Sequence, residues 1–304
     1  MAEKILYDYN VAVIKRYTDD KYKLTVHNVL RRRGYEYDCD KLPKLRNVNN
    51  DKLLNNIARA RNTVFEYALC NDWQYFATLT LDKKKYDRYD LKKYIKDFGY
   101  FLQNYNRKRI SKIKYVLIPE KHKDGAWHLH GLFSGFSDDD LDLFTKDMFK
   151  DGRIPIYILD RLDDKCLFKW TQYSTKFGYC VLDKIRDKNR IASYVMKYFS
   201  KDVSRSVKEL NSRLYYSSLG LKRAVEIKRG LIDKGIIYNP DYSNDFVSVK
   251  WLTRKDIDIV KQVNYNSFTL YKSRLITRQK FVKYDWHKPY KSEIKNLKNF
   301  GWID

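Results

Sequence analysis

The chain has 304 residues, of which 43% are hydrophobic, so it can build one large domain or two modest ones and is not a disordered polycation. Its 62 Lys and Arg outnumber 38 Asp and Glu, and the resulting net charge of +24 is spread along the sequence. This charge favours a polyanionic partner, with nucleic acid ahead of a membrane surface. The alternative is a basic ribosomal or structural protein.

The cysteines and the apolar runs indicate the cellular compartment. The four cysteines are scattered and include no Cys-x-x-Cys pair, which is typical of reduced cysteines. No apolar stretch has the length of a membrane helix, and residues 1–7 lack the apolar run of a secretion signal. We therefore expect a cytoplasmic protein with no membrane partner.

Three segments are predicted in chain order. Residues 1–70 form an N-terminal extension, with short strands at 11–14 and 24–26 and a helix at 53–69. Residues 71–235 form the main domain, and residues 236–304 form a basic, aromatic C-terminal extension that begins with a strand at 246–251. In the main domain the apolar spacing predicts strands at 75–81, 116–118, 127–133, 154–159, 178–182 and 213–217, and helices at 91–105, from Ser137, and at 191–202.

The C-terminal extension mixes basic and aromatic residues between 272 and 298. Such a mixture can hold DNA by charge and stacking, and a packed extension is the alternative. The 27 tyrosines of the chain also suit a groove that stacks bases, although the codon bias of an AT-rich genome produces the same abundance.

A predicted hairpin carries the first candidate site. His128 and His130 lie one residue apart on its return strand, although the chain has only five histidines. Because side chains alternate along a strand, both imidazoles are expected on one face, with Leu129 in a core. The polar turn at 121–126 places Glu120 near His128, and two imidazoles with a carboxylate form a partial site for a divalent ion. The alternative is that a surface strand carries two histidines by accident.

The second candidate site lies on the predicted helix at 191–202, where Tyr-x-x-Lys occurs twice in succession. At helical spacing its side chains share one stripe, formed by Tyr194, Lys197, Tyr198 and Lys201. Because lysine is almost never fully buried without a partner, this stripe is expected to face a cleft, while the buried side of the helix holds Val195, Met196 and Phe199. The alternative is a surface helix whose lysines extend into water.

The two sites together suggest one reaction. A phenol has a pKa of about 10 in water, and a lysine one turn away favours the phenolate. A divalent ion on the histidine site would polarise a scissile phosphate. Tyrosine attack on DNA would then release a 3′-hydroxyl and leave a 5′-phosphotyrosine, which retains the bond energy for rejoining.

The order of the motifs resembles the HUH endonuclease superfamily. Residues 76–81, 128–131 and 194–201 are most similar to the rolling-circle replication initiators of small single-stranded DNA phages and related plasmids, in the branch with two tyrosines. The resemblance covers about residues 73–220. It implies an α+β fold, ferredoxin- or RRM-like, in which helices flank a central antiparallel sheet.

The resemblance also implies residue roles. Tyr194 and Tyr198 match the nucleophile positions, and Lys197 and Lys201 match their companion lysines. The implied cofactor is Mg²⁺ or Mn²⁺, and its expected ligands are His128, His130 and Glu120, whereas His122, on the turn, is expected to take no part.

The implied function is origin-specific nicking and joining of single-stranded DNA that initiates, and can terminate, rolling-circle replication in a bacterial cell, encoded by a phage or plasmid. The sequence has no P-loop motif, so a host or separate helicase and a polymerase are expected partners. A transposase or a relaxase would use the same chemistry, and the chain length favours an initiator over both. The alternative outside the enzymes is a basic DNA-binding protein without catalytic activity, in which the histidines bind a structural ion.

Overall fold

The computed structural model describes residues 7–31, 50–150, 156–162, 165–187, 190–197, 213–232 and 239–256. The chain divides into two compact units, one formed by 1–47 with 224–304 and the other by 48–223. The boundaries predicted from the sequence lie after residues 70 and 235. The observed division differs because strands near the N-terminus pair with strands near the C-terminus. Of the described helices, none combines the length and the apolar character needed to cross a membrane.

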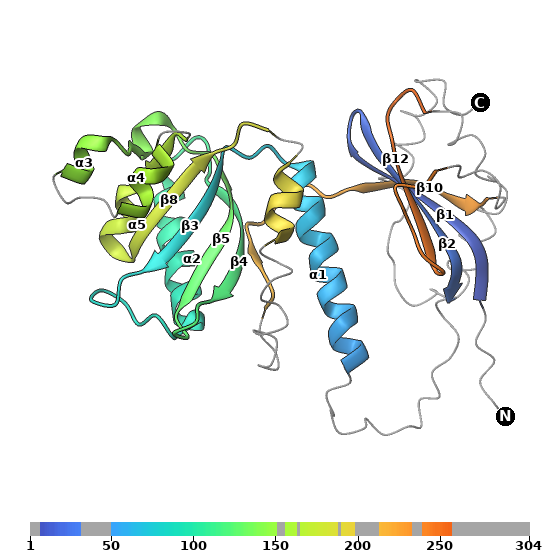
Figure 1. The fold of residues 1–304 in the computed structure, drawn as a ribbon, viewed down its shortest axis with the longest axis horizontal. Coiled ribbons are helices and arrows are strands. Elements are labelled where there is room, and N and C mark those ends of the chain that lie inside the picture. The colour runs from blue at the N-terminus through green and yellow to red at the C-terminus, as the bar shows by residue number, and fades with distance from the viewer. Residues whose placement is uncertain are drawn as a thin grey trace. The chain divides into compact units, whose positions relative to one another are not determined.

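The first unit contains a five-stranded antiparallel sheet built from both ends of the chain (Figure 1). The strand order is β10-β1-β2-β12-β11, and the strands are β1 (Tyr7–Thr18), β2 (Lys21–Arg31), β10 (Val225–Leu231), β11 (Tyr242–Ser243) and β12 (Val247–Leu252). The strands predicted at 11–14, 24–26 and 246–251 are confirmed by β1, β2 and β12. The sequence prediction missed β10, because Lys228, Arg229 and Gly230 interrupt its apolar pattern.

The second unit contains a seven-stranded antiparallel sheet in the order β6-β7-β8-β3-β5-β4-β9, which confirms the predicted α+β class. Its strands are β3 (Tyr75–Leu81), β4 (Lys114–Lys121), β5 (Trp127–Ser134), β6 (Asp142–Leu143), β7 (Leu167–Lys169), β8 (Gly178–Lys184) and β9 (Tyr216–Ser217). Its described helices are α1 (Asn50–Cys70), α2 (Leu91–Arg107), α3 (Lys146–Lys150), α4 (Ile156–Leu162) and α5 (Thr171–Lys176), and residues 191–197 are also helical.

Two predicted elements of this unit need correction. The strand predicted at 154–159 is wrong, because residues 156–162 form helix α4, whose Ile158 is buried in a small apolar cluster. A short apolar run does not distinguish a strand from the buried side of a helix. The helix predicted from Ser137 is only a 3-10 turn, η1 (Asp138–Asp140), since the Asp140 carboxylate caps the turn by accepting hydrogen bonds from Ser137 and the chain then enters β6.

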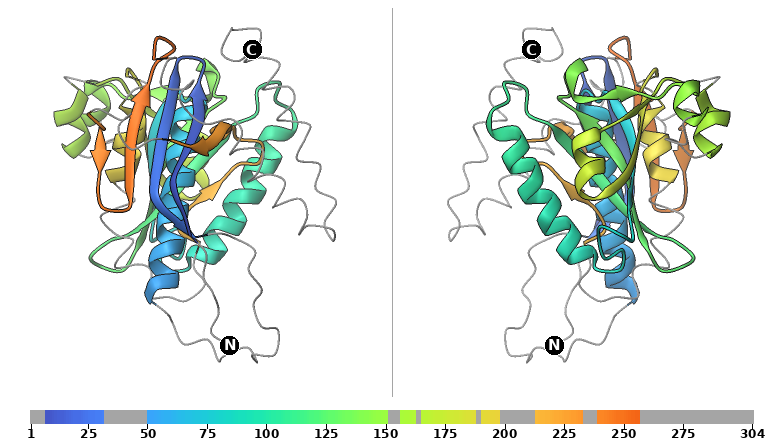
Figure 2. Two further views of the ribbon diagram at one scale, coloured as in Figure 1. Left: turned by 90° about the vertical axis from the view of Figure 1, so that its right-hand side faces the viewer. Right: turned by 90° about the vertical axis from the view of Figure 1, so that its left-hand side faces the viewer.

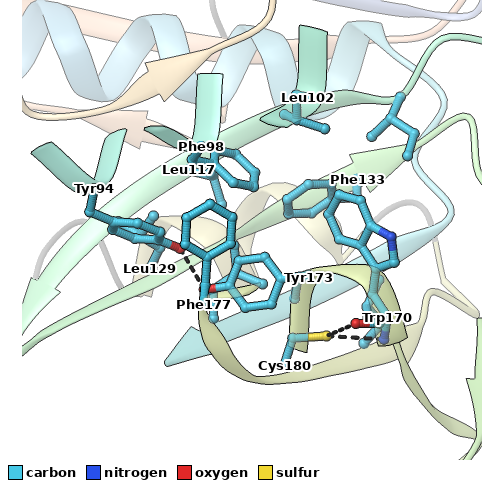
Figure 3. Close-up of a cluster of buried hydrophobic side chains, with 14 of the residues drawn as sticks. Tyr94, Phe98, Leu102, Leu117, Leu129, Phe133, Trp170, Tyr173, Phe177 and Cys180 are labelled. Carbon is cyan, nitrogen blue, oxygen red and sulfur yellow. Dashed lines mark hydrogen bonds between the residues drawn. The ribbon is translucent and has the colours of Figure 1, made fainter. Parts of the chain in front are cut away.

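One face of the seven-stranded sheet carries an aromatic core under α2 and α5 (Figure 3). Figure 2 shows α2 from opposite sides as an unbroken helix, and its buried residues recur at helical spacing: Leu91, Tyr94, Phe98 and Leu102. The hydroxyls of Tyr94 and Tyr173 hydrogen-bond at 2.6 Å, and burial raises the pKa of both phenols. Burial likewise raises the pKa of the Cys180 thiol to about 12, although this thiol accepts a hydrogen bond from the Trp170 backbone N–H at 3.1 Å.

The opposite face of the same sheet packs against α1 and the helix at 191–197. Val64 and Ala68 of α1 and Ile191 and Val195 of the second helix are buried there against a strip of sheet residues that includes Phe76, Val116, Ile118 and Leu132. Because side chains alternate along β5, the face that holds Leu132 also holds the two histidines.

Gly131 lets β4 and β5 approach closely beside the histidines. A Cβ atom at this position would lie 1.9 Å from the Val116 carbonyl oxygen, far inside van der Waals contact. Gly131 is therefore needed because the backbone of β4 packs directly against it.

We predict that Gly131→Ala lowers the free energy of unfolding by about 1–3 kcal/mol, because the added methyl group forces β4 and β5 apart. Gly99→Ala is the matched control on α2, since a methyl group added there would meet nothing within 4 Å, and it should raise stability by up to about 1 kcal/mol. Urea denaturation followed by circular dichroism measures both changes. Wild-type stability of Gly131→Ala would show that the two strands do not need this close contact.

Candidate functional site

The histidines lie on β5, between β3 and β4 inside the sheet. In the strand register, Thr80 pairs with His128 and Thr78 with His130 on the β3 side, while Glu120 pairs with His128 on the β4 side. Both imidazoles are half-buried and Leu129, between them, is completely buried. The two rings therefore share the face of the sheet that packs against the helix at 191–197.

A threonine of β3 holds each histidine. The Thr78 Oγ1 lies 3.2 Å from His130 Nδ1, and the Thr80 Oγ1 lies 3.1 Å from His128 Nδ1. With Nδ1 in contact with a threonine, Nε2 is the nitrogen of each ring that could bind a metal, and a contact at the other ring nitrogen is how metal-binding histidines are usually oriented. Neither threonine is predicted as a site residue from the sequence, although their spacing of two residues in the adjacent strand matches the spacing of the histidines.

Glu120 contacts the second histidine. Its Oε2 lies 2.6 Å from His130 Nε2, although its cross-strand neighbour is His128. The side chains are 23% and 12% exposed, respectively, so water screens this contact only in part. The structure thus brings the three predicted metal ligands together on adjacent strands.

The residue types of His128, His130 and Glu120 suit a divalent ion, but their ligand atoms do not point to one common position in the structure. Among the residues that the structure describes, no three His, Cys, Asp or Glu side chains are arranged so that they could hold a metal. Two imidazoles anchored through Nδ1 and a carboxylate are suitable ligands by type. To bind an ion with both histidines, Glu120 would have to exchange its bond to His130 for one to the metal.

His122 lies against the site, contrary to the expectation that it takes no part. Its imidazole stacks on that of His128, with ring centroids 5.1 Å apart and an interplanar angle of 29°. Its Nδ1 lies 3.4 Å from Asp124 Oδ1, and the turn between the strands closes through Gly125, whose φ is 86°. No sequence pattern marks this stacking, because it depends on the conformation of the turn.

The loop before α2 fixes this turn. Arg88 forms an ion pair with Asp124 at 3.2 Å, and its carbonyl oxygen accepts a hydrogen bond from the Trp127 backbone N–H. The Trp127 indole N–H donates to the Tyr89 carbonyl oxygen at 3.1 Å. These contacts hold the turn, and with it the ring of His122, beside the strands.

The surroundings of His128 lower its pKa. Burial is the largest cause, and the neighbouring His122 and His130 add to it, while Glu120 and Asp124 act in the opposite direction. The imidazole of His128 therefore stays neutral to lower pH than an exposed histidine, and the neutral form is the one that binds metals.

The helix at 191–197 places Tyr194 on the same face as the histidines. The Tyr194 ring meets Phe76 edge-on, with centroids 4.5 Å apart, and Phe76 stacks on His130 at 6.2 Å. Tyr194 is 39% exposed and Lys197 is also exposed. On the opposite side of the helix, Val195 and Met196 are buried as predicted, whereas Tyr198, Phe199 and Lys201 lie outside the described residues.

We predict that His122→Ala raises the pKa of His128 towards that of an exposed histidine, because the change removes a covering ring and the electrostatic effect of His122, which lowers this pKa. NMR titration of the imidazole protons measures the pKa. His27→Ala, which removes a histidine from the other unit, is the control and should leave the pKa of His128 unchanged. An unchanged pKa in His122→Ala would contradict the observed stacking.

Comparison with known proteins finds a family model that spans the residues of this site. Residues 74–203 match the family model of the replication-associated protein ORF2, and this segment runs from the start of β3 through the histidine strand and past Tyr194. No curated protein and no solved structure gives a significant match. Over residues 74–203 the family match therefore confirms the resemblance to rolling-circle replication initiators that the three motifs predict.

Proposed function

We propose that this chain nicks and rejoins single-stranded DNA at a replication origin, through a tyrosine that becomes linked to the 5′-phosphate. The family match supports the role of a replication initiator. The observation that carries the chemistry is the shared sheet face: the predicted metal ligands lie on β4 and β5, and Tyr194 contacts Phe76, which also stacks on His130.

Tyr194 is the proposed nucleophile. Its hydroxyl oxygen bonds to the phosphorus, the P–O3′ bond breaks, the phenol loses its proton, and the departing 3′-oxygen takes up a proton. Lys197, one turn along the helix, would favour the phenolate or hold a phosphate oxygen. The reverse attack by a 3′-hydroxyl on the phosphotyrosine rejoins the strand without ATP.

Tyr198 is the proposed second nucleophile, with Lys201 as its companion lysine. At helical spacing these residues follow Tyr194 and Lys197 by one turn on the same stripe. One tyrosine would hold the first DNA end while the other cleaves again, which a replication cycle needs in order to terminate. A host or separate helicase and a polymerase would complete the cycle.

His128, His130 and Glu120 are the proposed ligands of Mg²⁺ or Mn²⁺. A divalent ion bound there would neutralise charge on the scissile phosphate and help orient it. The chain contributes a neutral His128 and two rings fixed through Thr78 and Thr80. Because strands hold all three ligands, the phosphate would be fixed on a rigid sheet while a separate helix supplies the nucleophile.

Covalent adduct formation tests the nucleophile assignment. Labelled single-stranded oligonucleotides from the genome or plasmid that encodes the chain are incubated with the protein and Mn²⁺, and adducts are resolved on a denaturing gel. We predict that Tyr194→Phe/Tyr198→Phe lowers the adduct yield about 100-fold or more, because no nucleophile is left on the helix. The matched control Tyr100→Phe removes an exposed hydroxyl from α2 and should retain wild-type yield. Adduct that survives in the double variant would overturn the assignment.

Metal dependence tests the ligand assignment. We predict that His128→Ala abolishes Mn²⁺-stimulated cleavage but leaves most of the salt-sensitive DNA affinity intact, because the basic surface is unchanged. Thr80→Val, which removes only the hydroxyl that orients His128, should weaken Mn²⁺ binding about 10- to 100-fold in calorimetry. Unchanged Mn²⁺ affinity in both variants would exclude His128 as a ligand.

A further inference from the structure

An open pocket of about 290 Å³ lies beside Tyr194, on the same face of the seven-stranded sheet. Five side chains form its apolar lining: Phe76, Leu132, Ile185, Ile191 and Tyr194. They come from β3, β5, the segment after β8 and the helix at 191–197, so several elements of one unit build the pocket. The function proposed above uses Tyr194 but gives the pocket no role.

The charged residues at the pocket are mainly basic. Four cations line it, Lys165, Lys184, Arg186 and Arg190, against two carboxylates. Both carboxylates already have cationic partners, since Asp183 forms ion pairs with Lys165 and Arg161 and Asp187 forms one with Arg190 at 3.3 Å. An apolar lining with a net positive charge suits a ligand that is flat, apolar on its faces and anionic at one end.

We propose that this pocket binds one base of the single-stranded DNA, in the nucleotide next to the phosphate that Tyr194 attacks. The base packs against Phe76, Ile185 and Tyr194, and its phosphate lies near Lys184 and Arg186. This inference rests on the proposed function, because it places the base of the strand that Tyr194 cleaves. It adds a binding site for the base that the histidine site does not provide.

Size and position support a base as the occupant. The volume of about 290 Å³ lies just below the range for ligand pockets, which is about 300–1,000 Å³, so the pocket fits a single base better than a folded partner. Phe76 lines the pocket and also stacks on His130 at 6.2 Å, so a base held here adjoins the histidine site. A base of duplex DNA is paired and stacked and cannot enter without being extruded, so the pocket favours single strands.

Fluorescence anisotropy with labelled oligo(dT) of about 20 nucleotides tests this proposal, with EDTA present so that no cleavage contributes. Ile185→Trp fills the pocket and Lys184→Glu reverses a charge at its edge; each should weaken binding about 5- to 20-fold. Ile110→Trp and Lys108→Glu make the same changes at exposed positions near the end of α2, and each should alter affinity less than about twofold.

An abasic oligonucleotide of the same length separates base recognition from charge. The wild-type chain should bind it about tenfold more weakly than oligo(dT), and Ile185→Trp should bind both with similar affinity because it has lost the pocket for the base. If Ile185→Trp and Lys184→Glu both bind oligo(dT) like the wild type, the pocket is not a DNA site. Circular dichroism verifies that each variant folds. If Ile185→Trp does not fold, Lys184→Glu still tests the proposal, because Lys184 is exposed and its replacement should not disturb the fold.

The outcomes distinguish this inference from the proposed function. If the pocket variants lose affinity while no variant and no wild-type protein forms an adduct, the pocket binds DNA and the nicking proposal fails. If the wild type forms adducts and the pocket variants do so with unchanged yield and affinity, nicking stands and the pocket proposal is overturned.

Discussion

The antiparallel register of β3, β5 and β4 is the constraint on which the candidate site depends. It sets Thr78 opposite His130 and Thr80 opposite His128, and it places Glu120 on the other side of the same histidine strand. A shift of one residue in either pairing would turn these side chains to the opposite face. The close contact at Gly131 fixes the approach of β4 to β5, so the register is maintained where the histidines need it.

One face of the seven-stranded sheet packs the large aromatic core, and the other face carries the residues of the candidate site. Under α2 and α5, large aromatic side chains such as Trp170, Tyr173 and Phe177 are completely buried. Burial of the apolar surface of each ring stabilises the fold by at most about 5 kcal/mol. The other face can therefore carry half-buried histidines, threonines and a carboxylate. Phe76 joins the two parts of that face, because it contacts both His130 and Tyr194.

The sequence predicts the elements that depend on local patterns and misses those that depend on distant contacts. Alternation predicts the strand that bears His128 and His130, and helical spacing predicts the buried side that holds Val195 and Met196. The stacking of His122 on His128 and the bond from Glu120 to His130 depend on how the turn and strands meet, which no local pattern records. The pairing of β10 with β1 joins residues more than 200 positions apart and is equally invisible in the sequence.

The bond between Glu120 and His130 determines how the site could respond to its ligands. In the structure the Glu120 Oε2 lies 2.6 Å from His130 Nε2, so each of these two partly buried polar groups has a partner and neither is desolvated alone. If a divalent ion binds as proposed, it would have to replace this contact, so binding of the ion and pairing of Glu120 with His130 would compete. The two histidines are already oriented by Thr78 and Thr80, so the rearrangement is confined to one flexible carboxylate side chain at the end of β4. Metal binding and the geometry of the phosphate site would thereby be coupled through Glu120, while the register of the strands and the position of Tyr194 against Phe76 stay as they are.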